Sequence, residues 1–504
     1  MNALAVIAPV VLPLVVSALQ LALRGMGAQR VLGVASTLAL SLLAGWLLYL
    51  AAEGPQVYQV GGWSPPLGIV LVLDRLSASL LAVTALIALG SLIFATGGTD
   101  KHSHAFHPLF QFQLMGLNGA FLTGDLFNLF VFFEILLIAS YGLLLHGGGG
   151  RRSRVAFHYV TLNLTASLFF LVGLAVLYGA AGTLNMADLA RTLPELPRES
   201  ADLARAGGLV LLGVFALKAA IFPLYMWLPA AYGAAMAPVA ALFAVMTKVG
   251  IYAVLRLDSL LFGALPGPGL EFLLLYAGLA TLLVGALGTL GAARLNNMVS
   301  YLMLVSIGTL LLGFGAREGQ GMGAALYYLF HTTLLTAGLY LLVGVIARQR
   351  APLGDRLQAG AALAQPTALG LLFFIGAIGV AGLPPLSGFL GKLLILQAFL
   401  TEPFMVPVYF GVLFGGFMVI LPLARAGSTL FWKQGLDPGP VRAAGVRTLG
   451  PAAALILSTL VLALGAGPTA RWAEGTAAEI RQPTSYIEAV LGPEADASGR
   501  EERP

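Results

Sequence analysis

One segment, LKAAIFPLYMWLP at residues 217–229, decides the fold class of this chain. It lies in the apolar stretch 207–232, which is long enough to cross a bilayer as a helix. Lys218 places a charge inside that stretch, where charges are costly and usually functional. Pro223 and Pro229 each remove a helix hydrogen bond, so the backbone there must be interrupted and surrounded by water or protein. The segment therefore predicts a broken membrane helix with a charge at the break.

The composition of the whole chain is that of a membrane protein. Of its 504 residues, 59% are hydrophobic and 10% are charged, and the mean hydropathy is +0.91. A soluble domain with a polar surface cannot have this composition. The net charge of +5 is small for the length and the basic residues are scattered, so nucleic-acid binding is not expected. Because the chain has no cysteine, disulfides and thiolate metal sites are excluded.

Apolar windows of about 20 residues predict roughly fourteen membrane spans, so we expect an all-α polytopic membrane protein. The spans are 3–23, 31–52, 69–95, 107–124, 126–146, 156–180, 207–232, 239–257, 270–292, 298–315, 321–346, 367–400, 407–431 and 449–467. Loops are numbered from the first span. The odd loops carry Arg24, Arg30, Lys101, Arg151, Arg152, Arg154, Arg294, Arg348, Arg350, Arg356, Lys433, Arg442 and Arg447, and the even loops only Arg191, Arg198, Arg205, Arg256 and Arg317. Since basic residues favour the cytoplasmic side, both termini are predicted to be extracytoplasmic.

A second broken span repeats the pattern of the first. Gly382, Pro384 and Pro385 interrupt the twelfth span, and Lys392 follows them. Spans four to eight and nine to thirteen then form two inverted sets of five, each with a broken fourth member, which is typical of transporters. The predicted division is a three-helix segment at 1–106, the two repeats at 107–257 and 270–431, a helix at 449–467 and a polar, disordered tail at 468–504.

Ionisable side chains inside the spans suggest proton conduction. A medium of low dielectric disfavours the charged form of a lysine, and a nearby carboxylate favours it again. Glu134 and Lys218 could therefore form a pair that releases a proton to Lys248 when the pair separates. His331 can accept and donate through its two ring nitrogens, and Lys392 would exchange the proton with the opposite phase. Bridging waters would be needed between these groups.

Each of these residues also has a structural explanation. Lys248 and Lys392 could extend toward the membrane surface, although Lys248 has nine residues of its span on each side. Glu134 and Lys218 could be a static ion pair, and His331 could simply be hydrogen-bonded to a neighbour.

A histidine-rich segment raises the question of a metal site. His102, His104 and His107 have suitable spacing, but Asp100 is the only acid nearby, so a solvated loop is the better interpretation. We expect no metal, cofactor or enzyme active site.

Three strings of this chain resemble a known family: GDLFNLFVFFEILLIASY at 124–141, LKAAIFPLYMWLP at 217–229 and GLPPLSGFLGK at 382–392. They resemble the antiporter-like proton-channel subunits shared by Mrp-type cation/proton antiporters and respiratory complex I, most closely the D component of Mrp. The resemblance extends over roughly residues 70–430 and implies a fourteen-helix fold. It also implies the roles of five residues: Glu134 and Lys218 as the coupled pair, Lys248 and His331 as the central relay, and Lys392 at the far half-channel.

One position departs from the family pattern. Some relatives carry a lysine shortly after the histidine of the eleventh span, whereas here Thr332, Thr333 and Thr336 follow His331.

The resemblance implies a proton-translocating subunit of a multisubunit Na⁺/proton antiporter in a bacterial cell membrane, with other membrane subunits as partners. The alternative is a membrane-arm proton-pumping subunit of complex I or of a membrane-bound hydrogenase, but the phenylalanine-rich segment before Glu134 favours Mrp. A scaffold that only organises partners is a further alternative. It would have no use for charges in mid-membrane.

Overall fold

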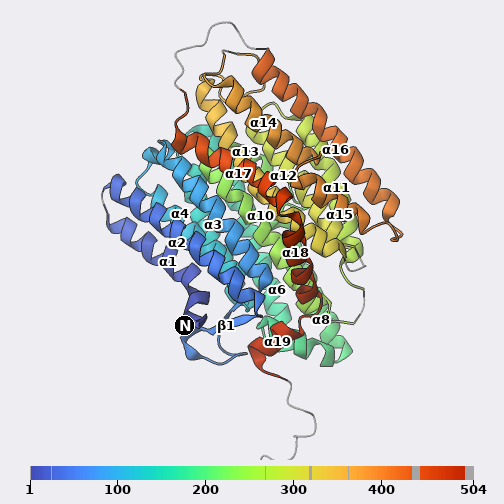
Figure 1. Cartoon of the computed structure of the whole chain (residues 1–504). Coiled ribbons are helices and arrows are strands. Elements are labelled where there is room, and N and C mark those ends of the chain that lie inside the picture. Colours follow the sequence, from blue (N-terminus) through green and yellow to red (C-terminus); the bar gives the residue numbers. More distant parts are fainter. Residues whose placement is uncertain are drawn as a thin grey trace, which may run out of the picture.

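The computed structural model describes residues 2–23, 25–266, 268–316, 320–360, 362–433 and 443–493. Arg24, Arg317, Arg442 and the end of the predicted tail, 494–504, lie outside the described residues. The described chain is a bundle of helices, most of them roughly parallel, with one two-stranded hairpin at the end where the N-terminus lies (Figure 1).

The helices of the first half are α1 (Asn2–Ala22), α2 (Met26–Ala52), α3 (Arg75–Thr96), α4 (Phe106–Leu122), α5 (Leu126–Leu145), α6 (Gly150–Ala181), α7 (Met186–Thr192), α8 (Arg198–Lys218), α9 (Trp227–Ala234) and α10 (Ala237–Leu257). Those of the second half are α11 (Glu271–Gly291), α12 (Leu295–Phe314), α13 (Gln320–Gln349), α14 (Pro366–Ala381), α15 (Ser387–Gln397), α16 (Met405–Gly427), α17 (Val446–Leu464), α18 (Ala466–Arg481) and α19 (Thr484–Leu491). The strands β1 (Gln56–Gln59) and β2 (Val70–Leu73) pair antiparallel, with Gln56 opposite Leu73.

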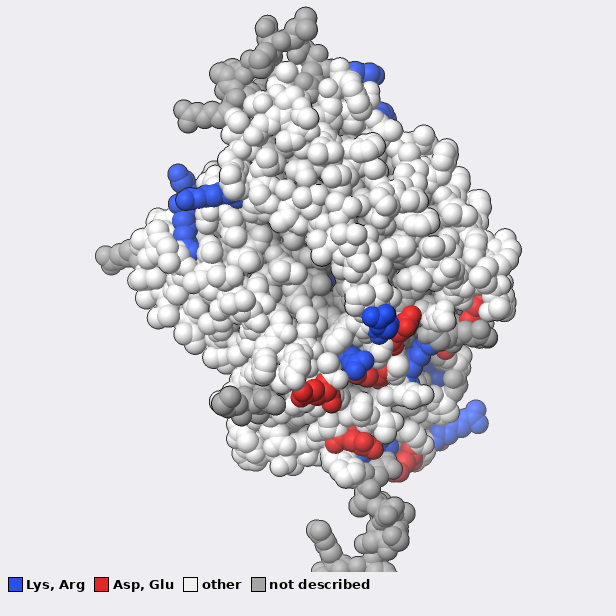
Figure 2. All heavy atoms as spheres, viewed as in Figure 1, with Lys and Arg blue, Asp and Glu red and all other residues white. Residues whose placement is uncertain are grey.

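Twelve helices of the described residues are long and apolar enough to cross a membrane. At the fourth and twelfth predicted spans lie the 17-residue α4 and the pair α14 and α15, with 16 and 11 residues. The expected class, an α-helical polytopic membrane protein, is therefore confirmed, whereas the number fourteen and the inverted repeats remain predictions. Figure 2 agrees with a membrane location, because charged side chains are scarce across the middle of the visible face.

Both predicted helix breaks are present. α8 ends at Lys218 and the chain resumes as α9 at Trp227, so the interruption contains Pro223, which has no backbone N–H to donate. α14 is closed by Gly382 with φ 77°, a left-handed conformation that glycine adopts without a Cβ clash, and α15 begins at Ser387. At each break the last carbonyls of the first helix lie outside the regular helix hydrogen-bond pattern and must find other donors.

The third predicted span, 69–95, starts too early. Its first residues form β2, and α3 begins at Arg75. Asp74 caps this helix, because its side chain accepts a hydrogen bond from the Ser77 N–H at 2.9 Å and the Ser77 hydroxyl accepts one from the Asp74 N–H at 2.9 Å. A short, fully buried apolar run does not distinguish a strand from the start of a helix, which is why the hairpin was not predicted.

The predicted disorder of the tail is wrong for residues 468–491, which form most of α18 and all of α19. The buried residues Ala473, Thr476, Ala477 and Ile480 follow the spacing of one helix face, and α18 packs against α13 and α3. Trp472 donates from its indole Nε1 to the Ser79 hydroxyl at 2.8 Å. The polar residues that suggested disorder belong to the other face of this amphipathic helix.

The centre of the bundle is α10, in which every residue from Pro238 to Leu257 is buried. α12 and α13 are also buried over nearly their whole described length. The helices that carry Lys248 and His331 are therefore shielded from lipid by protein on all sides.

Candidate functional site

Glu134 of α5 and Lys218 at the end of α8 are hydrogen-bonded to the same helix, α6. Ser167 donates its hydroxyl to the Glu134 carboxylate, and Lys218 Nζ donates to Oδ1 of Asn163 at 3.0 Å. Lys218 Nζ also lies 5.9 Å from the ring centre of Phe133. The contacts of the described residues include no direct ion pair between Glu134 and Lys218; instead each of the two predicted partners is hydrogen-bonded to a side chain of α6.

Lys248 occupies the core next to the first break. Its helix approaches the break closely at Gly250, where a Cβ would lie 2.9 Å from Cα of Ala219. The side chain of Lys248 is 0% exposed, and its Nζ donates to the Thr247 hydroxyl at 3.4 Å. Within the described part of the chain no carboxylate or histidine touches it. Extension of Lys248 toward a membrane surface is ruled out by this burial.

His331 and Lys392 meet at the second break through three consecutive backbone carbonyls. His331 Nε2 contacts Gly379 O at 3.1 Å, and Lys392 Nζ donates to Val380 O at 3.1 Å and to Ala381 O at 2.9 Å. Lys392 is directed to the interrupted backbone rather than to the membrane surface, which contradicts the alternative explanation for this residue.

The hydrogen bonds of His331 fix the position of one ring proton. A carbonyl only accepts, so Nε2 carries a proton and donates it to Gly379 O. Nδ1 lies 2.8 Å from the Ser387 hydroxyl, which donates to Nδ1 in the neutral ring and accepts from it in the protonated ring. Gly388 allows this arrangement, since a Cβ there would lie 2.6 Å from His331 Nε2 and closer still to Gly379 O. In the structure both ring nitrogens of His331 therefore have a hydrogen-bond partner.

The five predicted residues thus form three groups. Glu134 and Lys218 share α6, His331 and Lys392 share the second break, and Lys248 lies alone between them on α10. No hydrogen bond among the described residues joins one group to the next.

Most of the chain that carries this geometry matches a known family. Residues 123–420 match the family model described as "NADH:quinone oxidoreductase/Mrp antiporter, TM". This chain belongs to that family. The match includes both broken helices and all five residues above.

Relatives of similar length carry antiporter names. The chain is 39% identical to the D component of a probable K(+)/H(+) antiporter of Rhizobium meliloti, over 96% of this chain and 97% of that protein. It is 37% identical to the D component of the Na(+)/H(+) antiporter of Alkalihalophilus pseudofirmus, over 96% and 99%.

Solved structures give the same relationship. A chain of the Mrp complex from Dietzia sp. is 28% identical with a TM-score of 0.87, and the match covers 97% of this chain and 100% of that chain. A chain of respiratory complex I from Thermus thermophilus is 26% identical with a TM-score of 0.79, and that match covers 98% and 100%.

A buried ion pair in this member of the NADH:quinone oxidoreductase/Mrp antiporter family was not predicted. Arg256 was assigned to a loop, but it lies in the last turn of α10, is 5% exposed and pairs with Asp74. Its guanidinium also lies 5.1 and 5.0 Å from the ring centres of Tyr252 and Tyr486. The ion pair joins the end of α10 to the start of α3. The ring of Tyr486 adds a contact between the same guanidinium and α19.

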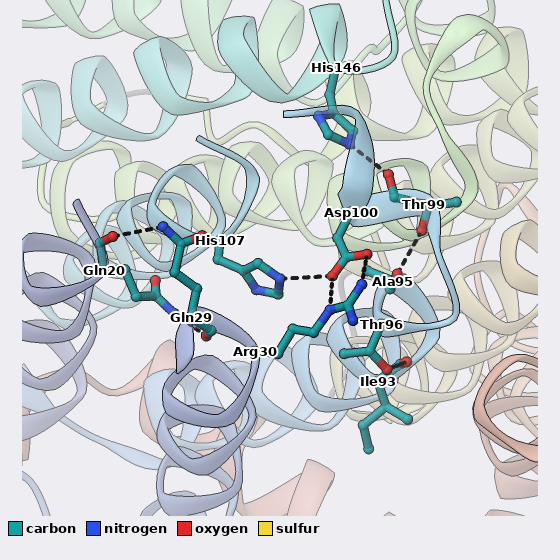
Figure 3. Close-up of polar contacts among 10 residues, drawn as sticks. All are labelled: Gln20, Gln29, Arg30, Ile93, Ala95, Thr96, Thr99, Asp100, His107 and His146. Atoms are coloured by element: carbon teal, nitrogen blue, oxygen red, sulfur yellow. Dashed lines mark hydrogen bonds and ion pairs between the residues drawn. The ribbon is translucent and has the colours of Figure 1, made fainter. Parts of the chain in front are cut away.

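The predicted solvated loop around the histidines is wrong for His107. His107 and Asp100 are both buried, and Asp100 accepts from His107 Nε2 at 3.0 Å and from Arg30 at 2.6 and 2.8 Å (Figure 3). Burial alone would raise the pKa of Asp100, but the hydrogen bonds from His107 and Arg30 and the charge of Arg30 hold it well below its usual range.

The same close-up shows that this network reaches the end of α5. His146 Nε2 donates to Thr99 O at 2.8 Å, beside Asp100 in the turn between α3 and α4 (Figure 3). The described residues contain no group of three or more His, Cys, Asp or Glu side chains that could bind a metal ion. The network therefore connects α2, α4 and α5 through hydrogen bonds and an ion pair.

Two residues next to the proton-path candidates were also missed. Asn163 and Ser167 are both buried on α6, one helical turn apart. The signal was present, since polar residues at i and i+4 in an apolar span lie on the same helix face.

Proposed function

We propose that this chain is the proton-translocating membrane subunit of a multisubunit monovalent cation/proton antiporter. One observation supports this most directly: buried ionisable side chains on central helices lie beside two helix breaks. Such groups inside a membrane are costly, and they mark ion or proton pathways more often than structural sites. The relatives named as components of Na⁺/H⁺ or K⁺/H⁺ antiporters support the cation/proton assignment.

The first proton transfer would begin at Lys218. Its ammonium is hydrogen-bonded to a neutral amide, so no carboxylate directly opposes release of the proton. Lys248 is the next basic group, on the helix packed against the break, and water would have to bridge the two amines. Movement of Glu134 toward or away from Lys218 would change how firmly Lys218 binds its proton.

The second half of the path would use the tautomers of His331. Rotation of the Ser387 hydroxyl would free Nδ1 to take a proton from the side of Lys248, after which Nε2 could release its own proton toward the break. Lys392 lies at the same carbonyls and would pass the proton to the opposite aqueous phase. The alternative that His331 is only a structural residue predicts no loss of transport when its ring is replaced by an amide of similar hydrogen-bonding ability.

The cation would be Na⁺ or K⁺, since both appear in the names of the relatives. We further propose that other membrane subunits flank this chain and supply the cation pathway. The competing assignment, a complex I or hydrogenase subunit, has weaker support, because the Mrp chain has the higher TM-score and both relatives from Rhizobium and Alkalihalophilus are named as antiporter components.

We propose an orientation with both termini extracytoplasmic. The N-terminal end of α1 and the helix α19 lie at the same end of the bundle (Figure 1). On the face shown in Figure 2, the acidic side chains gather toward this lower end, whereas the upper part carries only basic ones. The predicted odd loops carry thirteen basic residues and the even loops five, and loops rich in Lys and Arg favour the cytoplasmic side.

The function is tested in vesicles that contain the assembled complex with its partner subunits. Lys218→Ala and Glu134→Ala should each abolish cation-dependent proton movement followed by dye fluorescence, while native gels show normal assembly. Lys433→Ala is the control, because this exposed lysine belongs to a loop where a lone charge contributes little. Near wild-type antiport in an assembled Lys218→Ala complex would refute the proposal.

A further inference from the structure

We infer that Asn163 and Ser167 of α6 are positioning residues that set the charge states of Lys218 and Glu134. The inference rests on the proposed function and deepens it, because it names the groups that control the first proton transfer. α6 packs against both α5 and α8, the helices that carry Glu134 and Lys218.

The two side chains occupy the buried face of a helix whose other face is exposed. Asn163 is 1% and Ser167 is 7% exposed, whereas Thr161 and Thr165 on the same helix are exposed. Polar groups in an apolar interface must find partners, since an unpaired buried polar group is costly. Here each partner is one of the two ionisable side chains.

The orientation of the Asn163 amide is fixed. Its Nδ2 donates to Tyr159 O, one turn earlier, at 2.8 Å, so Oδ1 is the atom that faces Lys218. Ser167 has a single hydroxyl proton and donates it to Glu134. Asn163 therefore stabilises the ammonium form of Lys218, and Ser167 stabilises the carboxylate form of Glu134.

A neutral acceptor such as the Asn163 amide stabilises the ammonium form of Lys218 less than a carboxylate would and more than an apolar side chain would. A carboxylate at position 163 would add a full charge and make proton release harder, whereas an apolar side chain would leave the buried ammonium without its acceptor. Among the described residues, the titratable groups nearest the pair are Tyr141 of α5 and Tyr159 of α6, and α10, which carries Lys248, packs against α8. Tyrosines ordinarily titrate at about pH 10, above the range of the experiment.

The test measures antiport against pH, from about 6 to about 9, in vesicles carrying the whole complex. Asn163→Asp should move the midpoint of the activity profile to higher pH, and Asn163→Leu should move it to lower pH, each by about one pH unit for a charged hydrogen bond gained or lost. The matched control is Thr165→Val, a polar-to-apolar change on the exposed face of the same helix. Its profile should coincide with that of the wild type.

Opposite shifts cannot come from general damage to the fold. The inference is overturned if the Asp and Leu variants shift the midpoint in the same direction or not at all. If either fails to assemble on native gels, Ser167→Ala and Ser167→Thr replace it: the alanine variant should lose antiport about tenfold and the threonine variant should recover it, and wild-type activity of Ser167→Ala would overturn the inference. Failure of the proposed function is distinguishable, because Lys218→Ala would then retain antiport whatever the variants at 163 do.

Discussion

The close approach of α15 to His331 leads to a quantitative expectation for Gly388→Ala. A Cβ at this position would lie 2.6 Å from His331 Nε2, which is 0.4 Å less than the 3.0 Å that real Cβ atoms keep from other heavy atoms. It would lie closer still to Gly379 O, so either α15 or the end of α14 must move. The contact most directly affected is the 3.1 Å hydrogen bond between His331 Nε2 and Gly379 O.

The cost of this change can be bounded from two effects. Inserting a methyl group into a packed interior costs about 1 to 3 kcal/mol, and a buried hydrogen bond broken without replacement costs about 1 to 3 kcal/mol. If only about 2 kcal/mol of this raises the barrier to proton transfer, antiport slows about 30-fold. The complex should still assemble, because the change is confined to the contacts of the second break with His331.

The assay is cation-dependent proton movement in vesicles, with native gels for assembly. Gly213→Ala is the control, since no heavy atom lies within 4 Å of a Cβ at that exposed helical position. This variant should transport at the wild-type rate. Antiport of Gly388→Ala within twofold of wild type, in a normally assembled complex, would show that the contact between α15 and His331 is not needed for transport.

Three further predictions concern stability and topology. Asp74→Ala should lower the free energy of unfolding by about 3 to 5 kcal/mol, seen as a lower thermal midpoint of the purified complex, because Arg256 would remain buried without its partner. Asp100→Asn should be less stable than wild type, and the difference should not shrink as the pH falls from about 8 to about 5. The pKa of Asp100 is held well below its usual range, so its contribution is complete above the unfolded-state value of about 3.9 and is lost only as the pH falls through the lower folded-state value. A difference that vanished by about pH 5 would contradict the ion-paired network. In intact cells an impermeant thiol reagent should label a cysteine at the exposed Ser64, in the β1–β2 loop, but not one at the exposed Ser153, and the reverse result would invert the orientation.

The spans and breaks were predictable because their causes are local. An apolar stretch of about 20 residues matches the bilayer, and Pro223 or Gly382 alters the backbone wherever the rest of the chain lies. The same argument located the candidates Lys218, Lys248 and Lys392, since a lysine in the middle of a span has few alternative explanations.

Contacts between distant segments could not be predicted in this way. Asp74 and Arg256 are 182 residues apart, and neither residue carries a local sign of its partner. The i, i+4 spacing of Asn163 and Ser167 places both on one face of an apolar helix, but it does not say which face meets the protein: Thr161 and Thr165 have the same spacing and are exposed, and lipid and protein core are equally apolar. The helical tail was missed for another reason: its overall polarity outweighed the regular spacing of Ala473, Ala477 and Ile480.

The carbonyls of the second break have a consequence for how this region tolerates sequence change. Gly379, Val380 and Ala381 serve as acceptors through their main-chain oxygens, and every amino acid has such an oxygen. Point mutations at these three positions can change shape but cannot remove the acceptors. Substitutions that impair this half of the pathway are therefore expected at the donors, His331 and Lys392. They are also expected at the glycines that allow the backbone of α15 to approach His331 closely. A saturation mutagenesis map of the region should show tolerance at Val380 and Ala381 wherever volume is conserved, and intolerance at Gly379, Gly382 and Gly388, where an added Cβ would meet a neighbour.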